Sequence, residues 1–81
     1  MAKFNVIIQP EAERDFRAVP FPFRRQLNQK IYALKDEPRP PESEIILDEL
    51  RVVRVAGWRL LYEIDETTTT FTVLAVLPPV G

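Results

Sequence analysis

The stretch Arg54-Val55-Ala56-Gly57-Trp58-Arg59 predicts a tight β-hairpin, because two small residues separate two apolar segments rich in strand formers. With Ala56 and Gly57 in the turn, each residue before it lies directly opposite one after it. The predicted pairs are Val55 with Trp58, Arg54 with Arg59, Val53 with Leu60, and Val52 with Leu61. Two arginines therefore face each other across neighbouring strands, where like charges cost about 0.2–1 kcal/mol.

Such a like-charged pair is compatible with two interpretations. An acidic neighbour can neutralise it, and Glu63 falls on the same face of the predicted strand. Alternatively, the pair binds an anion such as phosphate, which a guanidinium matches in geometry. The sequence leaves both interpretations open.

Apolar alternation and turn residues predict five strands in all. They span residues 3–9, 44–47, 51–55, 58–65 and 69–77. The alternation also predicts which side chains share a face. One face is nearly all apolar and belongs against helices; it carries Val53, Val55, Trp58, Leu60, Tyr62, Ile64, Phe71, Val73 and Ala75.

Two helices are predicted between the first and second strands. Pro10 suits the first position of a helix, and Val19-Pro20 ends it, because proline disfavours helical geometry in the residue before it. The second helix covers residues 22–36 and has an apolar stripe and a basic outer face. The expected fold is α+β over one domain, residues 1–81: an N-terminal strand, a helical hairpin, then an antiparallel β-sheet (β-α-α-β-β-β-β).

The sheet face turned away from the helices is unusually aliphatic. It is expected to carry Val52, Leu61, Leu74 and Val76. Exposed apolar groups on this scale mark an interaction surface, so a partner segment or a second copy of the chain is expected to cover it. Phe21 and Phe23 either plug the space between the helices or add to partner docking.

Composition narrows the chemistry. The 81 residues include no cysteine and no histidine, which removes thiolate nucleophiles and the usual base near neutral pH. Acidic pairs in predicted loops are typical of solvated surface, so neither a metal nor a cofactor is expected. Without a signal-peptide or membrane-spanning pattern, a cytoplasmic protein is expected. The net charge of −1 means that any nucleic-acid contact must rest on a local basic patch. The basic outer face of the second helix is either solvated or turned toward RNA or a partner.

Three segments together resemble the RelE/ParE superfamily of type II toxin–antitoxin toxins. The first is the opening strand with Pro10-Glu11-Ala12, Phe16 and Val19-Pro20; the second is Ile31-Tyr32-Ala33-Leu34 with Asp36-Glu37-Pro38-Arg39-Pro40; the third is Val53 to Asp65. The resemblance implies a toxin neutralised by a cognate antitoxin. RelE-like members are ribosome-dependent endoribonucleases that cut mRNA, whereas ParE-like members inhibit DNA gyrase.

The resemblance also implies roles for individual residues. Arg59 matches the arginine that acts as a catalytic or phosphate-contacting residue in RelE-like toxins, and Arg54 occupies the neighbourhood of a further basic residue. The family's other basic position on that strand falls near Val52. Glu63 is a weak candidate for a proton acceptor, because two nearby arginines would lower its pKa.

One departure from the family pattern concerns the segment after the last strand. Family members usually continue there with a glycine, a basic cluster and often a tyrosine, and Val80-Gly81 resembles only the start of that segment. A shortened, catalytically degenerate member that only binds an antitoxin therefore stays open. With no histidine and no such tail, the protein is not expected to cut naked RNA. Cleavage that is supported by ribosomal groups is expected instead.

Overall fold

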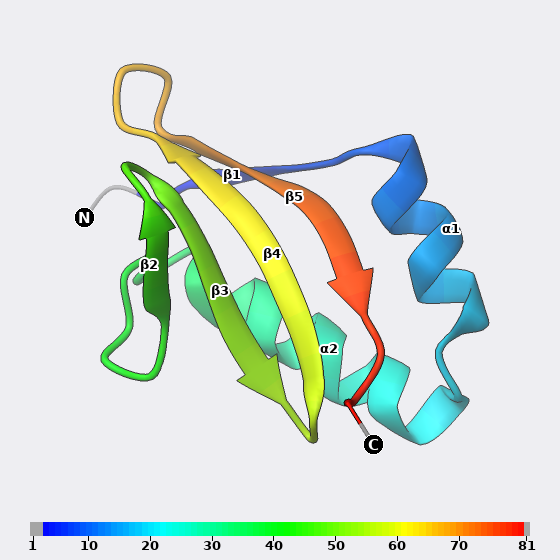
Figure 1. The fold of residues 1–81 in the computed structure, drawn as a ribbon. Helices are drawn as coiled ribbons and strands as arrows, with labels where there is room; N and C mark the ends of the chain where they lie inside the picture. Colours follow the sequence, from blue (N-terminus) through cyan, green and yellow to red (C-terminus); the bar gives the residue numbers. More distant parts are fainter. Residues whose placement is uncertain (1–2, 81) are drawn as a thin grey trace.

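The computed structural model describes residues 3–80, and these form a single five-stranded sheet with two helices packed on one face (Figure 1). The elements are β1 (Asn5–Ile8), α1 (Pro10–Ala18), α2 (Phe21–Leu34), β2 (Glu44–Leu47), β3 (Leu50–Val55), β4 (Trp58–Asp65) and β5 (Thr70–Leu77). The predicted α+β class and element order are confirmed.

The strand order is β1-β5-β4-β3-β2. The strands β2 to β5 pair antiparallel, as expected, but β1 runs parallel to β5 at the far edge. The sheet is therefore mixed rather than wholly antiparallel. Local periodicity could not reveal this pairing, because it joins the two ends of the chain.

The β3–β4 hairpin has the predicted register. Val52 pairs with Leu61, and Arg54 pairs with Arg59. The two turn residues have positive φ angles, 52° at Ala56 and 87° at Gly57. Positive φ at both central positions is the geometry of a type I′ turn, whose twist matches that of the flanking strands. The turn therefore fixes which side chains of both strands face the helices.

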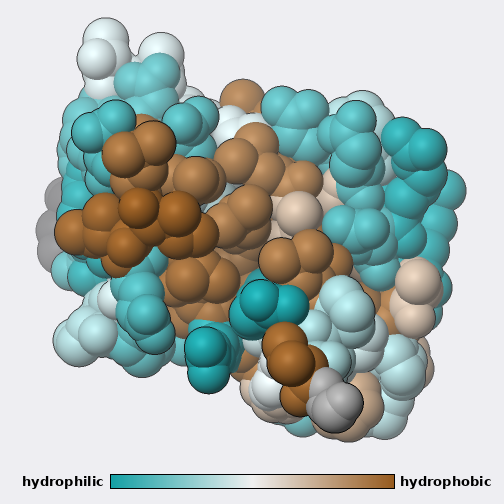
Figure 2. All heavy atoms as spheres, in the orientation of Figure 1, coloured by the Kyte–Doolittle hydropathy of each residue, from teal (hydrophilic) through white to brown (hydrophobic). Residues whose placement is uncertain are grey.

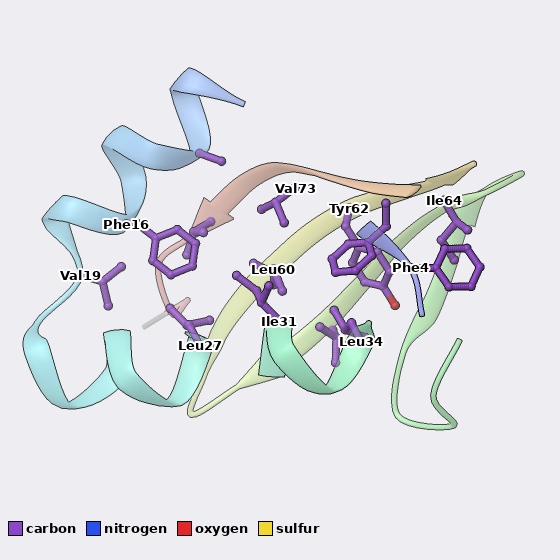
Figure 3. Packing of buried hydrophobic residues seen from close by; sticks show 14 residues of the cluster. Phe4, Phe16, Val19, Leu27, Ile31, Leu34, Leu60, Tyr62, Ile64 and Val73 are labelled. Carbon is purple, nitrogen blue, oxygen red and sulfur yellow. The ribbon is translucent and has the colours of Figure 1, made fainter. Parts of the chain in front are cut away.

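The core lies between the helices and the inner face of the sheet (Figure 3). Val53, Leu60 and Tyr62 contribute from the central strands and are fully buried. Leu27, Ile31 and Leu34 pack against them from α2, as the apolar stripe predicted. The ring of Phe23 contacts Trp58 beside the hairpin, with the two ring centroids 6.4 Å apart, whereas Phe21 is 70% exposed. Of the two phenylalanines, Phe23 alone thus packs toward the hairpin.

A bulge in β5 overturns part of the face assignment. Leu61 pairs with Ala75 but the next residue, Tyr62, pairs with Val73, so one extra residue is inserted around Leu74. The insertion reverses the alternation after Val73. Val76 therefore enters the core at 3% exposure, and Ala75 shares the outer face with Leu61. The predicted positions of Val76 and Ala75 were wrong for this reason.

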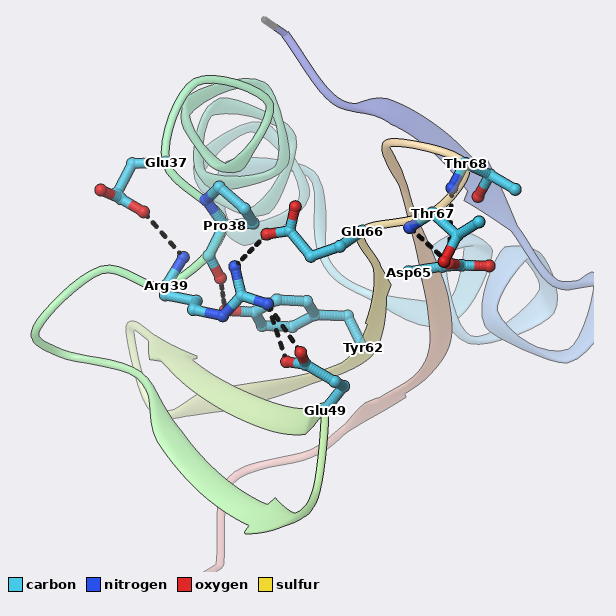
Figure 4. Close-up of polar contacts among 9 residues, drawn as sticks. All are labelled: Glu37, Pro38, Arg39, Glu49, Tyr62, Asp65, Glu66, Thr67 and Thr68. Carbon is cyan, nitrogen blue, oxygen red and sulfur yellow. Dashed lines mark hydrogen bonds and ion pairs between the residues drawn. The ribbon is translucent and has the colours of Figure 1, made fainter.

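The loop between α2 and β2 is held to the sheet by two polar contacts (Figure 4). The Tyr62 hydroxyl donates to the Pro38 carbonyl at 2.7 Å. The Arg39 guanidinium bridges Glu49 and Glu66 at 2.8 and 2.6 Å. Hydrogen bonds to Glu66 and Glu49 raise the pKa of Arg39, and burial raises the pKa of Tyr62 above its ordinary value near 10.

Replacing the buried hydroxyl gives a test of this loop anchor. Tyr62→Phe is expected to lower the free energy of unfolding by about 1 kcal/mol at neutral pH, because a buried carbonyl loses its donor. Tyr62 stays protonated in the folded state above pH 10 while the unfolded chain ionises, so its stabilisation is lost as the pH rises. Urea denaturation should show the difference between wild type and Tyr62→Phe shrinking above about pH 10. A constant difference up to about pH 11 would contradict the assignment.

Candidate functional site

The hairpin places Arg54 and Arg59 side by side on the sheet face opposite the helices. They are directly opposed residues of an antiparallel pair, and Arg54 is exposed while Arg59 is half-buried. Together with Gly57, Pro79 and Val80 they line a hollow of about 250 Å³. We call this feature the arginine hollow.

The segment after β5 forms the far wall of the arginine hollow. Arg59 Nη2 donates to the Pro78 carbonyl at 3.4 Å, which draws this segment across the end of the hairpin. A Cβ atom on Gly57 would lie 3.5 Å from the Pro79 ring. This is an ordinary van der Waals distance, so Gly57 is needed for the positive φ of the turn and not for the passage of the chain. Val80 is described, whereas Gly81, the other residue of the family-like dipeptide, lies outside the described residues.

Glu63 does not neutralise the arginine pair. It pairs with Leu50 and Thr72, four residues from Arg59 along β4, which is about 13 Å of strand. Instead it lines a separate acidic hollow with Asp48, Glu49, Ile64, Asp65, Glu66 and Thr67. The predicted closeness of Glu63 to the arginines was wrong. Among residues 3–80, no ion pair reaches Arg54 or Arg59.

Three other arginines have structural partners, whereas the side chains of Arg14, Arg17 and Arg25 form no hydrogen bond or ion pair within residues 3–80. Arg24 donates to the Val19 and Arg17 carbonyls where α1 ends, and Arg51 donates to the Ser43 hydroxyl at 2.7 Å. Arg39 forms ion pairs with the carboxylates of Glu49 and Glu66. By contrast, Arg54 and Arg59 face each other with no carboxylate partner in the described chain, and Arg59 Nε is enclosed there without an acceptor. The geometry thus favours the anion-binding interpretation of the pair.

The outer face of the sheet is aliphatic beside the arginine hollow, as predicted. Figure 2 shows a continuous hydrophobic area over the strands β2, β3 and β4. Val52, Leu61 and Leu74 are half-buried in or beside this face, while Val76 lies in the core. The edge strand β2 adds Leu47, which is 66% exposed and opposes the outward Leu50, and Ile46, which is 52% exposed. Ile45 is also 63% exposed, but it opposes Arg51 and lies on the helix side. Sequence reasoning missed this exposed apolar edge, although the run of three aliphatics was its signal.

A second residue that sequence reasoning missed is Asp15. Its Oδ2 atom accepts the backbone N–H of Val76 at 3.0 Å, which ties α1 to the bulged part of β5. Two residues further along, the chain enters the wall of the arginine hollow. No local pattern signals a contact between residues this far apart in the sequence.

The described chain shows neither a metal cluster nor a membrane-spanning helix. Within residues 3–80, the acidic side chains do not gather in groups of three or more that could hold a metal ion. Neither α1 nor α2 is long and apolar enough to cross a membrane.

Comparison with known proteins identifies the class. Residues 6–78 match the family model of the ParE toxin of type II toxin–antitoxin systems. The chain therefore belongs to this toxin family, within the RelE/ParE superfamily. A sequence search of curated proteins finds no match.

The fold is shared with solved toxins at low sequence identity. The crystal structure of the RelBE2 toxin–antitoxin complex from Mycobacterium tuberculosis matches with a TM-score of 0.84 and 23% identity, over 95% of this chain and 99% of that one. The isolated E. coli RelE toxin matches with a TM-score of 0.86 and 19% identity, over 99% and 87%. The RelE–RelB complex from Pyrococcus horikoshii matches with a TM-score of 0.82 and 18% identity, over 94% of each chain. These matches establish a RelE-like fold.

The bond from Asp15 predicts an effect on the arginine hollow at a distance. Asp15→Ala leaves the Val76 N–H without its acceptor, so the bulge and the following segment should shift. NMR spectra are expected to show changed amide signals at Gly57 and Val80 and a changed Arg59 Nε–H signal.

Asp15→Asn retains an acceptor oxygen and serves as the matched control, with near wild-type spectra at those positions. Changes in Asp15→Ala confined to α1 would show that the bond does not position the hollow.

Proposed function

We propose that this toxin is a RelE-like, ribosome-dependent mRNA interferase that inhibits translation. The observation that carries the proposal is the arginine hollow: Arg54 and Arg59 are held side by side, accessible, and without a carboxylate partner in residues 3–80. A phosphodiester is the anion that best fits two adjacent guanidinium groups on a nucleic-acid substrate.

The chemistry of RNA cleavage indicates what these residues supply. Attack by the 2′-hydroxyl needs a base, a cation that stabilises the negative charge on phosphorus, and an acid for the 5′-oxygen. Arg54 and Arg59 supply the cation. Tyr62 is fully buried and Glu63 lies in the acidic hollow, so neither stands ready as base or acid beside the pair. Groups of the ribosome or of the bound mRNA would complete the set, which explains a dependence on the ribosome.

The partner we propose is a cognate antitoxin that covers the aliphatic face of the sheet. The E. coli neighbour of this fold is a toxin crystallised in an intact RelBE toxin–antitoxin complex. In this chain the half-buried Val52, Leu61 and Leu74 lie in or beside an apolar face next to the arginine hollow. A segment bound there would bury that face and block access to the arginines together. A second copy of the chain is the alternative occupant.

Inhibition of DNA gyrase is the second candidate function. It is favoured by one observation, the match of residues 6–78 to a family model described as the ParE toxin. A gyrase inhibitor would act by binding alone and would not need the arginine pair as a catalytic group. The third candidate, a degenerate member that only binds an antitoxin, would need neither activity.

An assay on translating ribosomes separates these candidates. The wild-type protein is expected to cut mRNA on ribosomes and to leave a naked oligonucleotide intact. Arg59→Ala should slow single-turnover cleavage about 10²- to 10³-fold, the usual effect of removing one group that stabilises transition-state charge. Arg14→Ala, an exposed arginine on α1, is the matched control and should cut at the wild-type rate.

Two outcomes of that assay would contradict the proposal. Metal-independent cutting of naked RNA that is lost in Arg59→Ala would show a self-sufficient ribonuclease. Intact mRNA on ribosomes, combined with inhibition of gyrase supercoiling, would favour the ParE-like function.

The aliphatic face gives a separate test of partner binding. Leu61→Asp is expected to weaken binding of the co-encoded antitoxin at least tenfold, since it places a carboxylate in the apolar interface. Ile45→Asp makes the same change at a 63% exposed position whose strand partner, Arg51, is on the helix side, so it should bind nearly normally. Calorimetric titration measures both.

Equal affinities of the two variants would place the antitoxin elsewhere. Concentration-dependent dimerisation of the free toxin, lost in Leu61→Asp, would assign the face to a second copy of the chain.

A further inference from the structure

The solvent side of α2 forms a surface that neither the core nor the arginine hollow uses. Six residues line a hollow of about 580 Å³ there: Phe21, Arg24, Arg25, Asn28, Gln29 and Tyr32. We call this surface the α2 outer face. Its spacing of three and four residues places it along one side of the helix, away from the buried Leu27 and Ile31. The sequence from 21 to 34 contains no acidic residue.

Two aromatic rings are exposed to solvent, one at each end of this face. Phe21 is 70% exposed and Tyr32 is 63% exposed. They are eleven residues apart, which is about 16 Å along a helix. The Lys35 and Lys3 ammonium groups lie 5.4 and 5.6 Å from the centre of the Tyr32 ring. The ring is thus part of a cationic and aromatic surface.

The cations of α2 differ in what they already contact. Arg24 donates to backbone carbonyls and Lys30 pairs with Glu42 at 2.7 Å, so both have structural roles. Arg25 makes no side-chain hydrogen bond or ion pair among residues 3–80. Among nearby acidic residues, Asp36 pairs with Lys3 at 3.7 Å, and Glu49 and Glu66 pair with Arg39 in the loop after α2. A net charge of −1 therefore conceals a locally basic surface.

The same helix contacts the hairpin of the arginine hollow. The Phe23 ring, in the first turn of α2, lies against Trp58, the residue before Arg59. The hairpin turn and the beginning of α2 consequently lie at one end of the molecule (Figure 1). The arginine hollow lies on the opposite face of the sheet from α2, so an RNA that surrounds the hairpin end of the molecule would touch both surfaces.

We propose that the α2 outer face binds RNA and docks the toxin on a structured RNA beside the strand held by the arginine hollow. Arg25 and Lys35 would contact phosphates, Phe21 and Tyr32 would stack on unpaired bases, and the Asn28 and Gln29 amides would bond to base edges or 2′-hydroxyls. An acidic protein segment would match the positive charge equally well. It would offer fewer partners for the Asn28 and Gln29 amides and no bases to stack on the exposed aromatic rings. The inference rests on the proposed ribosome-dependent function, whose RNA-rich target it specifies.

Binding and cleavage must be measured separately to test this. Arg25→Glu and Tyr32→Ala are compared with Arg14→Glu, which makes the same charge change at an exposed position on α1. Co-sedimentation with purified ribosomes at several salt concentrations gives affinity, and single-turnover cleavage at increasing ribosome concentration gives the maximal rate.

The two α2 variants are expected to bind ribosomes at least about fivefold more weakly than Arg14→Glu, since one stacked base contributes about 1–3 kcal/mol. Arg25→Glu should also lower the salt dependence of binding by about one unit of log slope, as expected for one lost phosphate contact. The maximal cleavage rate should stay at the wild-type value, in contrast to Arg59→Ala.

Affinities equal to that of Arg14→Glu would overturn the inference while leaving cleavage, and so the proposed function, intact. If the two α2 variants bind ribosomes more weakly while the wild-type protein cuts no mRNA, the α2 surface is supported and the nuclease is rejected. If the variants bind ribosomes normally but lose the antitoxin, the surface binds protein and the inference is rejected.

Discussion

The two-residue turn at Ala56 and Gly57 is the constraint on which the rest of the structure depends. Its positive φ angles fix the β3–β4 register, and that register decides two things at once. It turns Leu60 and Tyr62 into the core, and it places the two arginines side by side on the outer face. A slip by one residue would exchange the two faces of a strand. Such a slip would disrupt the core packing and the arginine pair at the same time.

Charge in this chain is separated along the sheet rather than balanced within each neighbourhood. The carboxylates gather near the end where Arg39 binds Glu49 and Glu66. At the hairpin end, Arg54 and Arg59 repel each other and find no carboxylate among residues 3–80. Repulsion of this kind, about 0.2–1 kcal/mol, is small beside the stability contributed by the buried core. The fold can therefore hold a locally unfavourable pair in the geometry that an anion requires.

The sequence predicted what short-range patterns control. The turn, both helices and the inner apolar face follow from residues that are close in the chain, and the predicted hairpin pairs are all present. Contacts between distant segments were missed, because no local period encodes them. The parallel pairing of β1 with β5, the bond from Asp15 and the bulge that turns Val76 inward belong to this class. Glu63 was misplaced for a simpler reason: sharing a face is not the same as lying within reach.

Under the proposed function, the toxin supplies only positive charge at the phosphate, and its target would supply the rest of the reaction. Arg54 and Arg59 can bind a phosphodiester and stabilise charge on it, but no proton acceptor among residues 3–80 stands beside them. Correct placement of the RNA then has to come from a second contact, because two arginines alone fix a phosphate and not the strand around it. The α2 outer face offers such a contact, and the first turn of α2 packs against the hairpin through Phe23. In the proposed arrangement, recognition of the RNA and stabilisation of charge on its phosphate would use separate surfaces of one small domain.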